Sequence, residues 1–177
     1  PKNSTVTVGN LIVDDNSPVI TVEEGGELIV LNLTTIKSDG TLHIKGKFTT
    51  KGLENNSGNL IGSGIGTIEN TGDLNIKGSA SVALSGKSKI FSEGKLNING
   101  AGAMNFTENS EISITGDMDL SAGAQLKFND NSSMNAGKSL ILTGGAFITF
   151  DGMAIGRVDK DISLKAGAAI SLINHTF

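Results

Sequence analysis

The chain has 177 residues, of which 37% are hydrophobic, so it can form one folded domain with a sizeable core. Only 4% of the residues are aromatic, without Trp or Tyr, and 24 are Gly, which favours a narrow core with many tight turns over a compact globular enzyme. The net charge of -4, with Arg157 as the only Arg, argues against a nucleic-acid partner, and the lack of cysteine excludes disulfides and Cys-based metal sites.

Short segments that favour strands come first in the chain, at residues 5–8, 11–13, 20–22 and 42–44. The last two have the same spacing of apolar residues, one starting at Ile20 and the other at Leu42, which indicates two stacked copies of one strand. The longest apolar stretch, residues 28–33, is interrupted by Asn32 and has the length of a strand. We therefore expect no membrane insertion by this chain.

The next similar segment begins at Leu74, at an offset of 32 from Leu42, or one repeat of 22 plus ten. We assign the extra ten to residues 52–66, which are rich in Gly, Asn and Ser, and expect a loop insertion or an enlarged coil there. Because regular coils offer only a rigid scaffold, we expect this loop to bind the partner. The residues that we expect to make the contact are Leu53, Glu54, Asn55, Asn56 and Asn59.

A strict repeat with a period of 22 covers residues 72–177. The segment Gly72-Asp-Leu-Asn-Ile-Lys-Gly resembles segments that begin at residues 94, 116, 138 and 160. In each repeat, apolar and polar residues alternate in about three short stretches that Gly, Ala, Asn and Ser separate. This pattern predicts three strands and three corners per coil, and the equal spacing places each strand beside its counterpart in the next coil.

The sequence therefore predicts an all-β fold, a single-stranded right-handed parallel β-helix (solenoid) with about 22 residues per coil and a roughly triangular cross-section. We expect one domain, residues 1–177, with about eight coils and a length of about 38 Å. Inside it, Phe106, Phe128 and Phe150 should stack. At Gly156, where an apolar residue is missing from its column, we expect Ile155 to replace it.

The outward columns predict ladders of opposite charge. Asp73, Lys95 and Asp117 follow one another at the same position of successive coils, and Lys89 precedes Glu111 in the same way. Exposed ion pairs contribute little individually, so we expect these ladders mainly to help the register of the coils.

Three carboxylates are the best candidates for catalysis. Glu108 and Asp130 share a column on adjacent coils, and Asp151 lies one position out of register. Such groups could act as acid and base, or as nucleophile, in glycoside cleavage. All three lie in corner sequences, where Asp and Asn are expected for structural reasons, and no Trp or Tyr offers a platform for a sugar. We therefore interpret them as turn residues and predict no catalytic residues.

No metal or cofactor site is predicted. The calcium-binding pattern Gly-Gly-x-Gly-x-Asp does not occur, and the acidic residues at 23–26 indicate a turn. His43 and His175 are the only histidines and lie about six coils apart, so we expect both at the surface. The segment Gly62-Ser-Gly-Ile-Gly is not followed by Lys and is interpreted as a flexible corner rather than a phosphate-binding loop.

The coils of the form Gly-x-Leu-x-Ile-x-Gly, best seen at residues 72–78 and 94–100, resemble the passenger domains of bacterial type V secreted proteins. This group includes autotransporter adhesins and filamentous-haemagglutinin-like exoproteins. The Cys-free composition rich in Asn, Gly, Ser and Thr is similar too. The resemblance implies an extracellular rod at the surface of a Gram-negative bacterium, and it transfers no site residues.

We therefore predict a non-enzymatic structural segment of a surface-exposed or secreted adhesin-like protein. It would act as a rigid stalk that presents loops or a sheet face to a protein or glycan of a host or bacterial surface. The first alternative is a polysaccharide-cleaving β-helix of the tailspike or lyase type that uses Glu108, Asp130 and Asp151. The second is a self-associating scaffold like the polymerising bactofilins. The start at Pro-Lys-Asn and the lack of a polar cap on the last coil favour a fragment of a longer protein.

Overall fold

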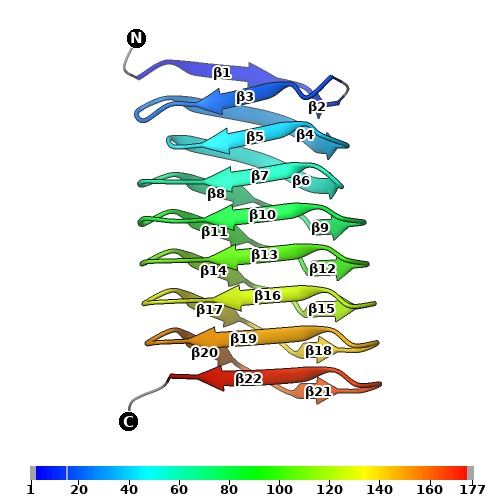
Figure 1. Ribbon diagram of the computed structural model, residues 1–177. Coiled ribbons are helices and arrows are strands. Elements are labelled where there is room, and N and C mark those ends of the chain that lie inside the picture. Colours follow the sequence, from blue (N-terminus) through cyan, green and yellow to red (C-terminus); the bar gives the residue numbers. More distant parts are fainter. Residues whose placement is uncertain (1–2, 15, 175–177) are drawn as a thin grey trace.

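The repeat is the coil of a right-handed β-solenoid in the computed structural model, which describes residues 3–14 and 16–174. About eight coils stack along one axis (Figure 1). In Figure 1 the near strands run to the left, and the chain returns to the right along the far side while it descends, so the path is right-handed. The described residues form no helix, and hence none that is long and apolar enough to cross a membrane. The predicted fold class is confirmed.

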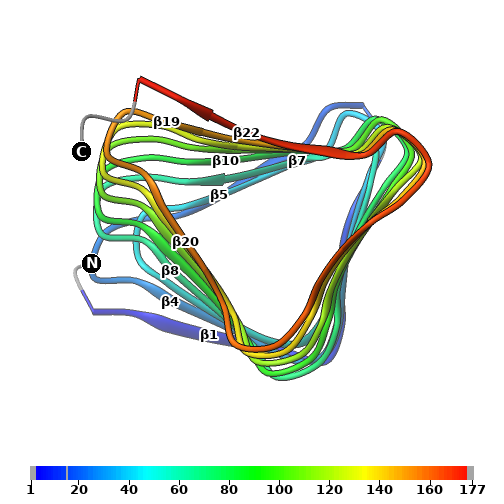
Figure 2. The same cartoon turned by 90° about the horizontal axis from the view of Figure 1, so that it is seen from below.

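Each coil contributes to three faces, which enclose a roughly triangular cross-section (Figure 2). Face A contains β1 (Thr5–Val8), the first part of β4 (Glu27–Lys37), the first part of β6 (Lys47–Asn56), β8 (Thr67–Asn70), β11 (Lys89–Ser92), β14 (Glu111–Ile114), β17 (Ser133–Ala136) and β20 (Ile155–Val158). Face B contains β2 (Leu11–Val13), the second parts of β4 and β6, β9 (Leu74–Lys77), β12 (Leu96–Asn99), β15 (Met118–Ser121), β18 (Leu140–Leu142) and β21 (Ile162–Leu164). Face C contains β3 (Val19–Val22), β5 (Thr41–Ile44), β7 (Asn59–Gly62), β10 (Ser81–Leu84), β13 (Ala103–Phe106), β16 (Gln125–Phe128), β19 (Phe147–Asp151) and β22 (Ala169–Ile173).

The strands of each face pair in parallel with their counterparts in the neighbouring coils. In the regular part the paired residues are one full repeat apart, as in the pairs Val82 with Met104 and Leu96 with Met118. Faces A and B form one 14-stranded sheet because β4 and β6 continue around the corner between them, and face C forms a sheet of 8 strands. The hydrogen bonds between coils therefore run along the rod axis, and each coil is stabilised by its two neighbours.

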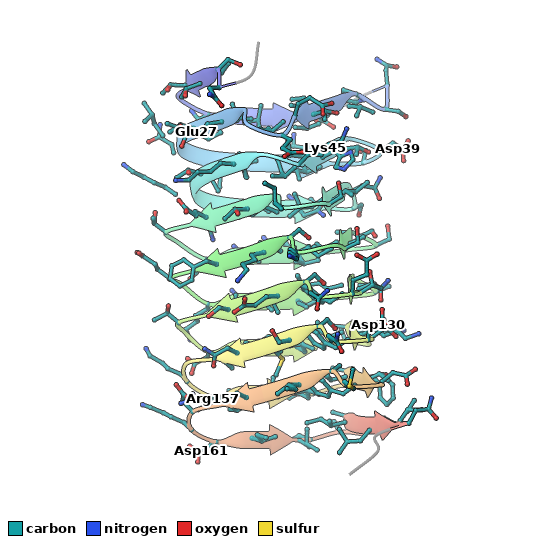
Figure 3. All side chains as sticks on the ribbon, turned by 90° about the vertical axis from the view of Figure 1, so that its left-hand side faces the viewer. Glu27, Asp39, Lys45, Asp130, Arg157 and Asp161 are labelled. Atoms are coloured by element: carbon teal, nitrogen blue, oxygen red, sulfur yellow. The ribbon has the colours of Figure 1, made fainter. Side chains whose placement is uncertain are left out.

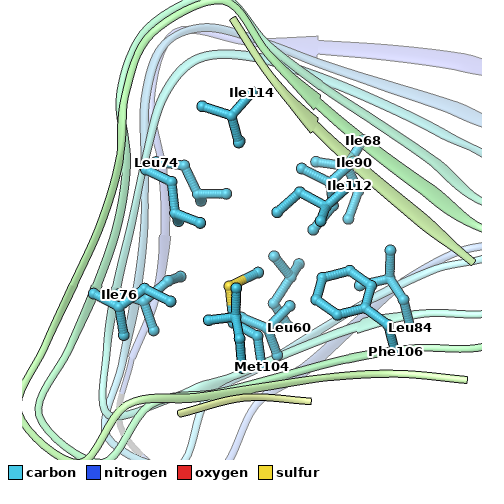
Figure 4. Packing of buried hydrophobic residues seen from close by; sticks show 14 of the residues in the cluster. Leu60, Ile68, Leu74, Ile76, Leu84, Ile90, Met104, Phe106, Ile112 and Ile114 are labelled. Atoms are coloured by element: carbon cyan, nitrogen blue, oxygen red, sulfur yellow. The ribbon is translucent and has the colours of Figure 1, made fainter. Parts of the chain in front are cut away.

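The core is a set of continuous apolar columns, one or two from each face, because alternate residues of every strand point inward. Figure 4 shows Leu74 and Ile76 facing Ile90, Ile112 and their neighbours across a narrow interior. The predicted aromatic stack is confirmed: the ring centroids of Phe106 and Phe128 lie 4.7 Å apart, and those of Phe128 and Phe150 lie 5.1 Å apart.

The space beside Gly156 is filled by Phe150, and the expectation that Ile155 fills it is wrong. Gly156 occupies the inward column, where it pairs with Met134. A Cβ atom at Gly156 would lie 2.4 Å from Cζ of Phe150, so the aromatic ring takes the place of the missing side chain. Ile155 is 67% exposed, because neighbouring residues of a strand point to opposite sides of the sheet.

The predicted charge ladders form along the corner between faces A and B. The Lys95 backbone N–H donates to Asp73 Oδ1 at 2.8 Å, and Lys95 Nζ lies 3.1 Å from Asp117 Oδ2. The Ser139 N–H also donates to Asp117 Oδ1, at 3.2 Å. On face A, Lys89 Nζ lies 2.8 Å from Glu111 Oε2. Half of these contacts use a backbone N–H, so the ladder fixes coil register as well as pairing charges.

Acidification is expected to destabilise the solenoid partly through Asp117. The hydrogen bond from Lys95, followed by that from the Ser139 N–H, holds the pKa of the Asp117 carboxyl below its ordinary value. A lowered carboxyl pKa stabilises the folded state above the ordinary pKa, and this contribution is lost as the pH falls through that range. Thermal unfolding between about pH 6 and pH 3 should therefore depend less on pH in Asp117→Asn than in the parent chain. The difference should be small, since the pair is exposed, and an identical pH dependence would contradict this assignment.

The coil from residue 41 to residue 58 is shorter than the others, and the predicted loop insertion at residues 52–66 is wrong. Thr41 pairs with Asn59, so this coil contains 18 residues instead of 22. Its three corners have two residues each, Lys45–Gly46, Lys51–Gly52 and Ser57–Gly58, whereas the corners of the next coil span residues 63–66, 71–73 and 78–80. Strands β6 and β7 occupy most of the segment that was expected to be a loop.

Leu42 and Leu74, whose spacing predicted the insertion, belong to different faces. Leu42 pairs with Leu60, which pairs with Val82, and all three lie on face C. Leu74 lies on face B, where it pairs with Leu53. Leu60 and Leu74 lie on different columns 14 residues apart, and the short coil lacks four residues, so the apparent excess of ten is the difference between these two numbers.

Candidate functional site

The short coil leaves a notch in the edge of the rod where face C turns into face A. Regular corners on this edge have four residues, but Lys45 and Gly46 stand alone between the corners at residues 23–26 and 63–66. In Figure 1 the turn before β6 stops short of the left-hand edge that the other turns reach. The resulting hollow has a volume of about 390 Å³. Its lining residues are Gly25, Gly26, Glu27, Gly46, Lys47, Ile65, Thr67 and Glu69.

Gly46 forms the floor of the notch, and its lack of a side chain permits the tight corner. Its N–H donates to the carbonyl of Val22 at 3.0 Å. A Cβ atom at this position would lie 2.3 Å from the carbonyl oxygens of both Glu23 and Gly26. The two-residue corner therefore requires the close approach of backbone to backbone that only Gly allows.

Charged side chains of face A line one side of the notch. Lys47 Nζ lies 3.1 Å from Glu69 Oε2 and 3.7 Å from Glu27 Oε1. The hydrogen bond to Glu69 is the main cause that raises the pKa of Lys47, so this lysine stays charged at neutral pH. In the short corner itself, Lys45 Nζ lies 3.0 Å from Oε2 of Glu23, which begins the preceding corner. Figure 3, which faces this edge, shows Glu27 and Lys45 on successive coils near the N-terminal end of the rod.

The notch also contains a backbone donor without a partner. In the regular corners, the N–H of the third residue donates to the carbonyl of the second residue in the preceding corner. These bonds join Lys87 to Gly64, Asn109 to Gly86, Asn131 to Glu108 and Met153 to Asp130, at 2.6 to 2.9 Å. Ile65 is the third residue of its corner, but the preceding corner has no residue at the matching place. Within residues 3–14 and 16–174, its N–H therefore makes no hydrogen bond.

The direction of this donor follows from the turn geometry. Gly64 has a φ of 63°, and the equivalent residues Gly86, Glu108 and Asp130 have φ values of 71°, 60° and 58°. Because the turns are alike, the Ile65 N–H is directed toward the preceding coil, which is the side where the notch lies. The Ile65 side chain is 59% exposed beside it.

Two of the five residues predicted to contact a partner are buried in the core of the short coil. Leu53 and Asn55 have no exposed surface, since they occupy the inward positions of β6. The Asn55 side chain accepts a hydrogen bond from the Gly58 N–H at 3.0 Å and donates one to the Ser81 carbonyl at 3.1 Å. These residues hold a corner in place, and their prediction as contact residues is wrong.

The other three predicted contact residues lie on strands rather than on a loop. Glu54 and Asn56 point outward from face B, and Glu54 Oε1 lies 3.6 Å from Lys77 Nζ. Asn59 is on face C, where its Nδ2 donates to Thr41 Oγ1 at 3.5 Å. The structure therefore does not bring these side chains together into one binding surface.

Glu108 and Asp130 occupy corners, as the turn interpretation predicted, and Asp151 is the last residue of β19, where the next corner begins. Asp130 Oδ2 accepts a hydrogen bond from the Glu108 N–H at 3.0 Å, and Asp151 Oδ1 accepts one from Asn174 Nδ2 at 3.0 Å. Glu108 and Asp130 both have positive φ values, of 60° and 58°. Asp130 and Asp151 are thus engaged in hydrogen bonds that fasten one coil to the next.

Replacing Glu108 with Gly is expected to stabilise the protein. Glu108 has a φ of 60°, whereas the equivalent positions in three other coils are Gly64, Gly86 and Gly152. The left-handed conformation costs a residue with a side chain about 1 kcal/mol, and Gly avoids this cost. We expect the free energy of unfolding in denaturant to rise by about 0.5–1 kcal/mol. Glu111→Gly, within a strand of the same coil, should instead lower the unfolding free energy, and a destabilised Glu108→Gly variant would refute the assignment.

His43 is placed outward on face C, as predicted, and the fold gives it a partner that the sequence did not indicate. Its Nε2 lies 2.8 Å from Ser63 Oγ, because β5 pairs with β7 just before the corner that Ser63 begins. His175 lies outside the described residues. In the part of the chain that the structure describes, no group of three or more His, Cys, Asp or Glu side chains is close enough to hold a metal ion.

The notch itself was missed by the sequence interpretation. Its one sequence signal is the spacing of Leu42 and Leu60, which falls four short of a full repeat. Comparison of the chain with protein-family models, with curated protein sequences and with solved structures found no match. The geometry of the solenoid and of the notch is therefore the basis for assigning a function.

Proposed function

We propose that the protein is a non-enzymatic structural segment of a surface-exposed or secreted bacterial adhesin-like protein. Its role is that of a rigid stalk, which spans distance and presents its faces and corners to a protein or glycan on a host or bacterial surface. The observation that carries the stalk role is the continuous parallel pairing of strands from the first coil to the last on all three faces.

The stalk role is supported by the way the coils are joined. Every strand of face C pairs in register with its neighbours from β3 to β22, so no flexible linker interrupts the rod within the described residues. The rings of Phe106, Phe128 and Phe150 also stack across two successive coil interfaces. A solenoid of this kind transmits a displacement at one end to the other, because no coil can move without breaking contacts to both neighbours.

The surface and adhesin roles are supported by the sequence of the coils. The Gly-x-Leu-x-Ile-x-Gly segments and the composition rich in Asn, Gly, Ser and Thr resemble those of secreted passenger domains. The lack of cysteine suits export, since a disulfide formed too early would hinder passage of an unfolded chain. The notch supplies a local departure from the regular surface where a partner can be recognised.

Removal of one whole coil tests the stalk role. Deletion of residues 103–124 joins Gly102 to Gln125, which occupies the position of Ala103, so the register is kept. We expect the shortened chain to fold with a similar circular dichroism spectrum and to keep its adhesion to cells, since the removed coil is remote from the notch. Deletion of residues 103–113 is the matched control, because it removes half a coil and should abolish folding. Loss of adhesion in a folded whole-coil deletion would refute a purely spacing role for these coils.

Surface location has a separate test. An antibody against this segment should label intact cells of the bacterium that produces it, and protease added to intact cells should remove the label. Labelling that requires lysis would refute the proposal of a surface-exposed segment.

A further inference from the structure

The notch combines three kinds of contact in the space of one missing corner. The Ile65 N–H is a backbone donor without a partner, and the Ile65 side chain is an exposed apolar surface next to it. Across the hollow, Glu27 and Glu69 provide carboxylate oxygens and Lys47 provides an ammonium group. A ligand that makes all three contacts must have a carbonyl acceptor, a small apolar group beside that carbonyl, and hydroxyl groups.

The charge around the notch determines whether a charged or a neutral acceptor is favoured for the Ile65 N–H. Lys47 is already shared by Glu27 and Glu69, and Lys45 is paired with Glu23. The rim therefore carries an excess of negative charge, which disfavours a carboxylate or phosphate and favours a neutral carbonyl. Hydroxyl groups of the ligand can donate to the carboxylates, since charge-assisted hydrogen bonds of this type are the strong ones.

We propose that the notch binds an N-acetylated amino sugar, one sugar residue of a surface glycan. The acetamido carbonyl accepts the hydrogen bond of the Ile65 N–H, its methyl group packs on the Ile65 side chain, and the sugar hydroxyls donate to Glu27 and Glu69. The ligand thereby occupies the place of the absent corner and completes the column of hydrogen bonds along this edge.

The dimensions of the notch favour a sugar over a peptide. Its volume of about 390 Å³ lies near the lower end of the range for small-ligand sites. An extended peptide binds by adding a strand to a free sheet edge. Here β5 is paired with β3 and β7, and β6 is paired with β4, β8 and β9, so neither strand beside the notch has a free edge.

This inference rests on the proposed function, because it names a ligand class for the presented surface. The two can fail separately. Sugar binding is measured on the isolated 177-residue chain, whereas the stalk and surface roles are measured by coil deletion and by labelling of intact cells.

Nuclear magnetic resonance titration of the ¹⁵N-labelled chain tests the site directly. N-acetylglucosamine and N-acetylgalactosamine are the probes, and glucose, which lacks the acetamido group and is also uncharged, is the matched control. We expect a saturable shift of the Ile65 amide signal with an N-acetylated sugar, and at least about tenfold weaker binding of glucose. No saturable shift with either N-acetylated sugar, or equal binding of glucose, would overturn the proposal. Equal binding of N-acetylglycinamide would show that the site takes a peptide-like amide and would also overturn it.

Two variants locate the binding. Insertion of Gly-Ser between Lys45 and Gly46 restores a four-residue corner, which should fill the notch, abolish the shift and leave the thermal unfolding midpoint unchanged or raised. Glu69→Gln should weaken binding, whereas Glu111→Gln, which breaks an ion pair with Lys89 on the same face but away from the notch, should not. Unchanged sugar binding in the folded insertion variant, or equal effects of the two Gln variants, would exclude the notch as the site.

Discussion

Replacement of Phe128 with Ala is expected to lower the free energy of unfolding by about 3–5 kcal/mol. Phe128 is fully buried and stacks on Phe106 at 4.7 Å and on Phe150 at 5.1 Å, so the substitution removes both ring contacts. The rigid spacing of the coils limits collapse around the cavity, because each neighbouring ring is fixed by its own strand. Chemical denaturation followed by circular dichroism measures the loss.

Phe91→Ala is the control for this prediction. Phe91 lies on β11 with its side chain outward and partly exposed, so its removal creates no internal cavity. We expect a change of less than about 1 kcal/mol for this variant. A similar loss of stability in the two variants would show that the internal stack adds nothing beyond general apolar burial.

Gly46→Ala is expected to destabilise the protein by about 2–3 kcal/mol and to disturb the notch. The added Cβ would lie 2.3 Å from the carbonyl oxygens of Glu23 and Gly26, and both are backbone atoms that cannot turn away. The corner must therefore move outward, which weakens the bonds that the Lys47 N–H and the Gly46 N–H make with the neighbouring coil. Thermal unfolding and the position of the Ile65 amide signal report the two effects.

Gly9→Ala is the matched control, since a Cβ at Gly9 would meet no other atom within 4 Å. Gly9 also lies in a corner and does not have a positive φ, so the comparison isolates the close contact at Gly46. If both variants unfold at the same temperature, the tight corner does not depend on the missing side chain.

The regular part of the fold could be predicted because its spacing is constant. From Gly72 onward, each apolar column recurs with the same period, and Leu74, Leu96 and Met118 pair as their positions predict. The short coil could not be placed in this way, because Leu and Ile occupy the inward columns of more than one face. The residue types of the inward columns therefore did not distinguish Leu42, which is on face C, from Leu74, which is on face B.

Composition was also misleading in this region. Asn, Ser and Gly are typical of loops, but Asn55 and Asn70 are buried at inward positions of β6 and β8, next to the corners that follow. Asn70 Nδ2 donates to the Gly72 carbonyl at 2.8 Å and to Ser92 Oγ at 3.0 Å. These asparagine side chains hydrogen-bond to the backbone of the adjacent corners from inside the solenoid, and the residue type alone does not predict this role.

The candidate site could not be predicted from the sequence, for a different reason. Its central donor is the backbone N–H of Ile65, which every non-proline residue possesses. Only the pairing of the neighbouring corners shows that this N–H has lost its partner. The charged residues Glu27, Lys47 and Glu69 come together because β4, β6 and β8 are adjacent on face A, although they are far apart in the chain.

The short coil also has a mechanical consequence. Because the hydrogen bonds between coils run parallel to the axis, a pull on the two ends of the rod loads all three faces at the same time. The interface above Ile65 lacks one bond that the equivalent corners of the same edge possess, so tension is expected to open this edge of the rod there first. A ligand held in the notch would bridge this gap, and its release would then depend on the force that the rod bears.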